Sequence, residues 1–200
     1  MNTNNVSLNV IGWVAIATGI SGLLGFNFII IFFTVGQPFG TLNDILIGLT
    51  AILSVILFWM IYTEYHRQFP LLGKVALIIP TIGAILVLVG SVLVISGTTG
   101  WFLSGQYMAA GNALIGLWLL IMSFSALRGN SLPHSLVIFG LICGVILTLG
   151  LVTIPGILRG IDSQEYEFSI FNSIWWSSSL GYLALFPIWC ILLGRNLLLK

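Results

Sequence analysis

Six long stretches without Asp, Glu, Lys or Arg constrain this chain more than any other feature of its sequence. They cover residues 10–35, 45–62, 75–96, 108–127, 136–154 and 174–194. A hydrocarbon core about 30 Å thick requires roughly 20 apolar residues per helix, so each stretch is long enough to cross it. No alternating strand pattern is present, and a lone span in lipid must satisfy its backbone groups internally. The sequence therefore predicts an all-α fold, one polytopic transmembrane domain of six helices over residues 1–200.

The composition excludes a water-soluble domain. Hydrophobic residues make up 58% of the chain and charged residues 6%. A chain with so few charged residues cannot form the polar surface that a globular domain needs in water. The first stretch lacks a basic leading segment and is longer than the apolar part of a signal peptide. We therefore expect it to be retained as a helix.

The basic residues predict the orientation of the helices. Five of the six fall in connections or tails on one side, namely Arg67, Lys74, Arg128, Arg195 and Lys200. Arg159 lies on the other side. Because Lys and Arg concentrate in cytoplasmic loops, both termini are predicted to be cytoplasmic.

Tryptophans near the stretch ends predict two aromatic belts at the membrane boundaries. The inner belt would hold Trp13, Trp59 and Trp189, and the outer belt Trp101, Trp175 and Trp176. Trp118 lies in the middle of its stretch. We expect it to pack inside the bundle rather than contact a ligand or pigment.

The second and fourth stretches share a short motif. Leu46–Leu49 has the same residues as Leu114–Leu117, and an asparagine precedes each copy, Asn43 or Asn112. The motif indicates either a same-sense duplication of two helical hairpins or a chance match in a chain rich in Leu, Ile and Gly.

Small residues at helical spacing predict where helices approach closely. Gly140 and Gly144 form a GxxxG pair in the fifth stretch, and Ala15, Gly19 and Gly22 form a stripe in the first. Small residues let two backbones come together in a membrane, so both sets are interpreted as packing faces.

No motif supports catalysis. Gly19-Ile20-Ser21-Gly22 resembles the nucleophile string of rhomboid proteases, but a serine nucleophile needs a base, and both histidines, His66 and His134, fall in predicted loops. Neither histidine has ligand spacing for a metal or haem. We therefore expect no enzyme activity, no metal and no cofactor. Asp44, three residues after Thr41, is interpreted as part of a helix-capping box.

The longest outer connection combines acidic and aromatic residues. Its carboxylates are Asp162, Glu165 and Glu167, and its aromatic segment contains Tyr166, Phe168, Phe171, Trp175 and Trp176. We predict that this segment either anchors the chain at the membrane boundary or contacts a partner protein. The carboxylates are interpreted as a solvated loop, with a divalent-ion site as the alternative.

The centres of the six stretches contain no ionisable residue. Ion pathways and intramembrane catalysis usually need such residues at depth, so their absence argues against a coupled pump or an enzyme. The remaining polar groups suit helix packing or a neutral ligand; they are Asn27, Thr50, Ser54, Thr81, Ser91, Ser123, Thr148 and Ser177 to Ser179.

The C-terminal half resembles a known group of proteins. The matching segments include Leu117-Trp118, Ala126 to Gly129, Leu132-Pro133, Phe139 to Leu141 and Phe186 to Arg195. They are similar to uncharacterised multi-spanning bacterial inner-membrane proteins grouped under domains of unknown function. The resemblance implies a multi-pass protein of the bacterial inner membrane and supplies no catalytic residue.

These observations predict the function only as a class. We expect a non-enzymatic accessory or assembly subunit, or a scaffold, of a membrane complex. The alternative is a small transporter or channel for a neutral or apolar solute. The expected partners are the lipid bilayer and other membrane protein subunits, and the absence of a basic patch argues against nucleic acid.

Overall fold

The computed structural model describes residues 3–65, 74–129, 132–162 and 169–199. Within these ranges the chain is helical without strands, and six helical spans are long and apolar enough to cross a membrane. The spans are Leu8–Val35, Phe39–Glu64, Leu77–Ile95, Trp101–Gly129, His134–Arg159 and Ser173–Leu198. The predicted all-α class and the six helices are confirmed.

Four spans are continuous helices and two are interrupted. The continuous helices are α1 (Thr3–Val35), α2 (Phe39–Tyr65), α3 (Lys74–Ile95) and α4 (Trp101–Gly129). The fifth span consists of α5 (His134–Thr148), a 3-10 segment (Leu149–Thr153) and α6 (Ile154–Arg159). The sixth consists of α7 (Ser169–Leu180), a π-helical turn (Gly181–Leu185) and α8 (Phe186–Leu198).

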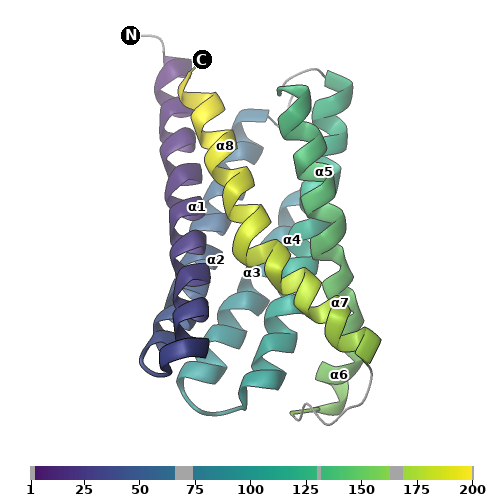
Figure 1. Cartoon of the computed structure of the whole chain (residues 1–200). Coiled ribbons are helices and arrows are strands. Elements are labelled where there is room, and N and C mark those ends of the chain that lie inside the picture. The colour runs from purple at the N-terminus through teal and green to yellow at the C-terminus, as the bar shows by residue number, and fades with distance from the viewer. Residues whose placement is uncertain (1–2, 66–73, 130–131, 163–168, 200) are drawn as a thin grey trace.

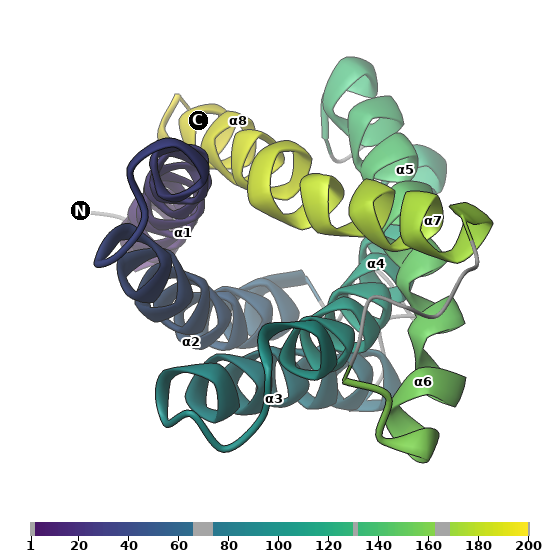
Figure 2. The same ribbon diagram turned by 60° about the horizontal axis from the view of Figure 1, so that its bottom comes forward.

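The helices follow one another around the bundle, and the sixth span closes it at an angle (Figures 1 and 2). Each of α1 to α4 packs on the next helix in the chain. Within the sixth span α8 packs on α1, whereas α7 packs on α4, α5 and the 3-10 segment. Both termini lie at one end of the bundle, which we call the terminal end (Figure 1). We call the other the opposite end.

In each of the six spans the helix begins before the residue that the sequence predicted, and the first begins at Thr3 instead of residue 10. The second begins at Phe39 instead of residue 45, and the fourth at Trp101 instead of residue 108. The predicted boundaries followed uninterrupted apolar runs. Asp44 and Gln106 end such runs, yet both are buried inside the bundle with polar partners.

The predicted capping box at Thr41 and Asp44 is wrong. The helix begins two residues before Thr41, so Asp44 lies inside it. The Gln37 side-chain oxygen instead accepts hydrogen bonds from the Thr41 backbone N–H at 3.3 Å and the Thr41 hydroxyl at 3.1 Å. Asp44 is therefore free for another role.

Asp162 caps the N-terminus of α4. Its carboxylate accepts a hydrogen bond from the Gly100 N–H at 2.6 Å and one from the Leu103 N–H at 3.0 Å. The first N–H groups of a helix lack partners within the helix and favour negative charge. Asp162 thus has a structural role, while Glu165 and Glu167 lie outside the described residues.

The sixth span contains a π-helical turn just before Pro187. Proline has no backbone N–H to continue an α-helical ladder, and the Phe186 N–H bonds to the Gly181 carbonyl, five residues back. Such turns often occur at functional sites. Here the turn contains Tyr182 and Leu183.

The predicted packing glycines lie at helix contacts. A Cβ added at Gly144 would lie 3.0 Å from the Gly116 carbonyl oxygen of α4, and one at Gly140 would meet Ser123 and Trp189. Lipid supplies no hydrophobic drive for association, so such close approach matters for stability.

The stripe on α1 faces the sixth span. Gly22 lies against the Pro187 ring, and Gly19 lies against the Pro187 carbonyl and Ile191. Ala15 is fully buried. The small side chains of α1 therefore give α8 room for its close contact with this helix.

Aromatic rings fill the middle of the bundle. The Phe58 and Trp118 ring centroids are 4.3 Å apart, those of Tyr182 and Phe186 5.7 Å, and those of Phe186 and Trp189 6.3 Å. These five residues, the aromatic column, are all buried. The predicted internal packing of Trp118 is confirmed.

The predicted inner aromatic belt is wrong at one of its three tryptophans. Trp13 and Trp59 are exposed on the bundle surface, as membrane anchors must be. Trp189, predicted to lie in the inner belt, is instead buried in the aromatic column. Trp189 lies near the end of an apolar stretch, and for that reason it was predicted to lie at the membrane boundary. Its side of α8 faces α4 and α5 instead.

Candidate ligand pocket

A pocket lies between four spans toward the opposite end of the bundle. Its lining comes from α1, α2, α4 and the α7 and π-helical part of the sixth span; the residues are Ile29, Asn43, Asp44, Ile47, Trp101, Gly105, Met108, Asn112, Trp175, Trp176, Ser179, Tyr182 and Leu183. It has about 520 Å³ of atom-free space, part of it open to the surroundings, and the centres of water-sized molecules can occupy about 60 Å³. The second of these volumes is the one comparable with the roughly 300–1,000 Å³ of common ligand pockets, so the enclosed part of this pocket is small.

The tilt of the sixth span creates this pocket. The span lies on α1 at α8 and on α4 and α5 at α7, so it leaves α1 as it approaches the opposite end. The lining runs from Trp101 to Asn112 along α4, roughly 16 Å at 1.5 Å per residue. Tyr182 belongs to both the lining and the aromatic column, which separates the pocket from the terminal end.

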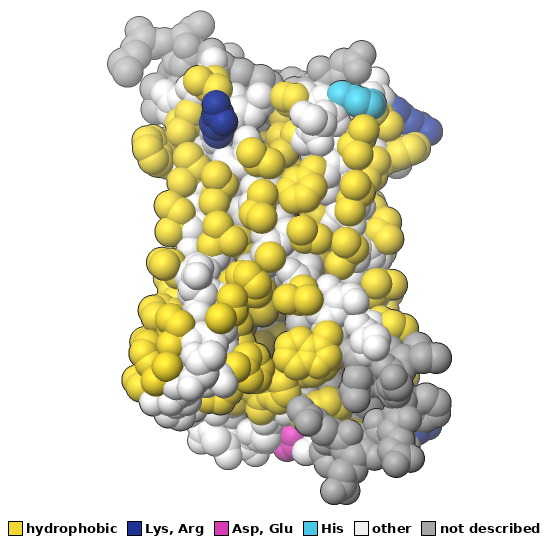
Figure 3. Space-filling model, in the orientation of Figure 1, with side chains coloured by type: hydrophobic (Ala, Val, Ile, Leu, Met, Phe, Trp, Pro, Cys, Tyr) yellow, Lys and Arg dark blue, Asp and Glu magenta, His cyan; other side chains and the backbone are white. Residues whose placement is uncertain are grey.

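The pocket opens through the side of the bundle. Figure 3 shows a recess among apolar side chains in the lower half of the face it presents. This lateral surface consists of side chains suited to lipid, and the dark blue and cyan basic side chains on this face gather mainly at the terminal end. A molecule dissolved in the membrane could therefore reach the pocket directly.

Two buried polar atoms in the lining lack hydrogen-bond partners among the described residues. They are the side-chain oxygens of Asn43 and Asn112, and each of these residues is only 3% exposed, whereas the equally buried Tyr182 hydroxyl has the Ser54 hydroxyl beside it. A buried polar atom without a partner costs roughly 1–3 kcal/mol, so native proteins usually satisfy such atoms. A bound molecule in the pocket would supply the missing partner.

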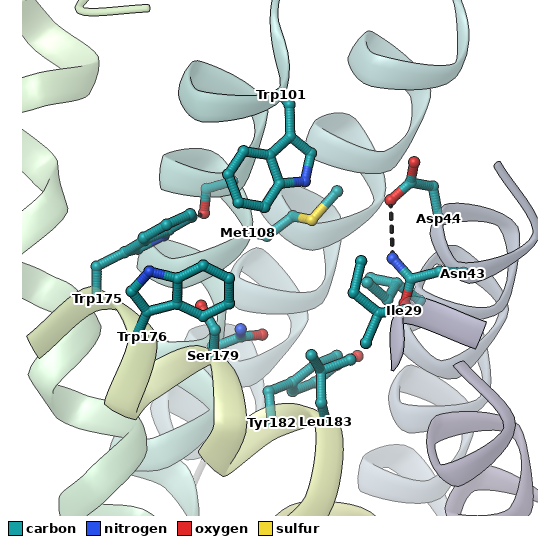
Figure 4. A pocket seen from close by; sticks show the side chains of 13 residues that line it. Ile29, Asn43, Asp44, Trp101, Met108, Trp175, Trp176, Ser179, Tyr182 and Leu183 are labelled. Carbon is teal, nitrogen blue, oxygen red and sulfur yellow. Dashed lines mark hydrogen bonds between the residues drawn. The ribbon is translucent and has the colours of Figure 1, made fainter. Parts of the chain in front are cut away.

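The free atom of Asn43 is fixed by its neighbour. The Asn43 amide nitrogen donates to an Asp44 carboxyl oxygen at 3.1 Å (Figure 4). If the Asn43 amide were rotated by 180°, its oxygen would face the Asp44 carboxyl oxygen, and two acceptors would then oppose each other. The Asn43 oxygen is therefore the atom without a partner. Asp44 is 8% exposed, and no lining residue among those described is basic.

Three tryptophans form one wall of the pocket, which we call the indole wall. Figure 4 shows Trp101, Trp175 and Trp176 on the side across from Asn43 and Asp44. The Trp101 and Trp175 centroids are 5.3 Å apart, edge to face, and those of Trp175 and Trp176 are 5.0 Å apart. The Trp175 indole N–H donates to the Gly105 carbonyl at 3.3 Å, which ties the wall to α4.

The residues of the predicted outer contact segment differ in their exposure. Trp175 is 3% exposed, so it cannot serve as a partner contact as predicted, because its ring packs on Trp101 and Phe102. Trp176 is 37% exposed and lies 6.3 Å from Phe33 of α1 between ring centroids. Tyr166 and Phe168, and the side chain of Phe171, lie outside the described residues.

The other sequence candidates take structural roles. Ser21 donates to the Leu46 carbonyl at 3.3 Å and accepts from Thr50 at 3.1 Å, which joins α1 to α2. Most of the mid-membrane polar groups bond their own helix, including Asn27, Thr50, Ser54, Thr81, Ser91, Thr148 and Ser177. Ser178 bonds the Leu147 carbonyl, and Ser179 lines the pocket.

The pocket residues were visible in the sequence but not recognised as a site. Asn43 and Asn112 precede the two copies of the shared motif, and Asp44 was assigned to capping. No local spacing joins positions 43, 112 and 182. The signal available was an asparagine two or three residues before each copy of the shared motif.

The arrangement can bind a small amphipathic molecule. Its walls are apolar and aromatic, and its few polar atoms converge on one enclosed volume, as in small-molecule sites generally. The resemblance of the C-terminal half to bacterial inner-membrane proteins stays a prediction. No family model, curated protein or solved structure matches the chain.

Proposed function

We propose that this chain is a non-enzymatic membrane protein that binds a small amphipathic molecule between its helices. The observation that carries the proposal is the pair of buried, unpartnered side-chain oxygens of Asn43 and Asn112 in one pocket. Helix packing alone leaves these atoms unsatisfied at a cost in stability. A ligand that donates hydrogen bonds to them offsets that cost.

The pocket supports the solute-binding alternative more than a purely accessory role. Trp175 and Trp176, which would have contributed to a partner surface, line the pocket instead. The aromatic column closes the pocket from the terminal end, so the arrangement fits a binding or carrier protein better than an open channel. Transport through it requires the column to move.

The membrane and the orientation are part of the proposal. Arg128 and Arg195 lie in the last turns of helices that end at the terminal end, whereas Arg159 ends α6 at the opposite end. The excess of basic residues at the terminal end supports cytoplasmic termini. The resemblance over the C-terminal half supports the bacterial inner membrane. The pocket then lies in the outer half of the bilayer.

A matched pair of serine variants tests the binding role. Ser179 lines the pocket, whereas Ser177 lies two residues away on the same helix, exposed and outside the lining. The parent, Ser179→Phe and Ser177→Phe are purified in maltoside, and the small molecules extracted from each are compared by mass spectrometry. We expect a compound retained by the parent and Ser177→Phe and lost from Ser179→Phe. Identical extracts from all three would refute binding in this pocket.

An accessory subunit is the second candidate. The exposed pair Phe33 and Trp176 forms an aromatic ridge at the opposite end that a neighbouring membrane protein could contact. Phe33→Ala tests it because Phe33 is 61% exposed and lies outside the pocket lining. Loss of a co-purifying protein from a variant with the parent's melting temperature would favour this role, and unchanged co-purification would count against it.

A further inference from the structure

The unpartnered side-chain atoms of the two asparagines in the pocket are hydrogen-bond acceptors, while the Ser179 hydroxyl and the Trp101 and Trp176 indoles of the lining carry donors. Asn43 and Asn112 each leave a carbonyl oxygen free, and Asp44 adds a carboxyl group. The Tyr182 hydroxyl can donate or accept. The complementary group on a ligand is therefore one rich in N–H or O–H donors.

The carboxyl group of Asp44 favours a positively charged donor. It lies within the second span, where an ionisable side chain is costly unless it is paired. Its hydrogen-bond partner among the described residues is the neutral Asn43 amide, and the described lining supplies no Lys, Arg or His to balance a negative charge. A cation from outside the chain would complete the pair.

The indole wall suits an organic cation. Tryptophan attracts cations through its ring more strongly than the other aromatic residues do. Trp101, Trp175 and Trp176 stand across the pocket from Asp44, so a charged head between them contacts a carboxylate on one side and indole rings on the other (Figure 4). Ile29, Met108 and Leu183 supply apolar surface for the remainder of the molecule.

We propose that the pocket binds a protonated primary or secondary amine attached to an apolar body, with its ammonium group between Asp44, Asn43, Asn112 and the indole wall. This inference rests on the proposed binding function and specifies its ligand class. The lateral recess lets the apolar body extend toward the lipid. The ammonium protons satisfy the free asparagine oxygens, and its charge balances Asp44.

Three probes of equal chain length separate charge from hydrogen bonding. They are n-hexylammonium, hexyltrimethylammonium and 1-hexanol, titrated calorimetrically into the parent in uncharged maltoside micelles. We expect hexylammonium to bind about tenfold more tightly than 1-hexanol, the factor that corresponds to one charge-assisted hydrogen bond. Hexyltrimethylammonium should bind less tightly than hexylammonium because it has no N–H for the asparagines. Equal affinities for hexylammonium and either other probe would overturn the proposal.

Variants locate the binding and identify the charge. Hexylammonium binding should disappear in Ser179→Phe and persist in Ser177→Phe. Asp44→Asn keeps the shape and removes the charge, so it should abolish the preference for hexylammonium over 1-hexanol while 1-hexanol still binds. A preference unchanged in Asp44→Asn would refute the role of the carboxylate.

The results distinguish this inference from the proposed function. If all three probes bind the parent equally and Ser179→Phe abolishes binding, the pocket is a ligand site but not an amine site. If hexylammonium binds the parent and Ser179→Phe equally, its binding lies elsewhere and the inference fails. The probe comparison in the parent decides the amine preference even if Asp44→Asn does not fold.

Discussion

Asn43 of α2 and Asn112 of α4 line the same pocket, and the side-chain oxygen of each is buried without a hydrogen-bond partner among the described residues. They lie 69 positions apart in the chain, Asn43 three residues and Asn112 two residues before the Leu-Ile-Gly-Leu motif that their spans share. Packing can satisfy a short polar side chain through its own helix, as it does for Asn27. The side-chain oxygens of Asn43 and Asn112 have no such partner among the described residues, and the proposed ligand would supply one.

Replacing Asn112 by leucine should stabilise the empty protein. The substitution removes a buried acceptor without a partner and keeps a similar volume, so we expect unfolding to cost about 1 kcal/mol more. The measurement is the melting temperature in maltoside. Asn27→Leu serves as the control because Asn27 is exposed and donates to the Leu23 carbonyl. A lower melting temperature for Asn112→Leu would mean that its oxygen has a partner in solution.

Leucine at Gly140 or Gly144 should destabilise the bundle. The added side chain meets Ser123 and Trp189 at the first position and the Gly116 carbonyl at the second, and overpacking of this kind costs about 1–3 kcal/mol. His134→Ala, at the first residue of α5, is the comparison and should have a small effect. Equal thermal stability of the glycine variants and the parent would contradict the close contact of α4 with α5.

Alanine at Asp162 should weaken the start of α4. The change removes both hydrogen bonds to the Gly100 and Leu103 N–H groups, and loss of a side-chain cap costs about 0.5–2 kcal/mol. Hydrogen exchange of the Leu103 amide should quicken. Thr98→Ala in the same connection is the control, since the exposed Thr98 hydroxyl pairs only with Ser96. Unchanged protection of Leu103 would show that another group caps the helix.

The predicted orientation can be checked by labelling with a membrane-impermeant maleimide. The buried Cys143 and Cys190 are first replaced by alanine. Thr98→Cys, between α3 and α4, should then react in intact cells, whereas His134→Cys, at the start of α5, should react only after permeabilisation. The reasoning is the excess of Lys and Arg at the terminal end. The reverse pattern would place the termini outside.

The spans could be predicted because crossing a membrane imposes a requirement on each segment separately. Apolar runs of sufficient length identified all six, and the internal packing of Trp118 followed from its mid-span position. The first residues of the helices were predicted less accurately than the spans themselves. Boundaries drawn at polar residues missed the starts of α2 and α4, because Asp44 and Gln106 are buried in the bundle with hydrogen-bond partners.

The sequence position of a tryptophan near the end of a span did not predict whether its side chain is exposed or buried. Trp175 and Trp176 are neighbours in the sequence, yet one is buried and the other lies on the surface. Successive residues of a helix point in directions about 100° apart, so the side that packs depends on where the neighbouring helices lie. Trp189 was assigned to a belt for the same reason and belongs to the aromatic column.

The sequence by itself determined the helical class, the membrane-spanning character and the small residues that permit close packing. These follow from the hydrophobicity and size of residues within single segments. The tertiary structure alone decided that the sixth span leaves α1 near the opposite end and brings Asn43, Asn112 and Tyr182 to one pocket. A site of this kind depends on the tilt and rotation of four spans relative to one another, and those are fixed by contacts between helices rather than by the pattern within any one of them.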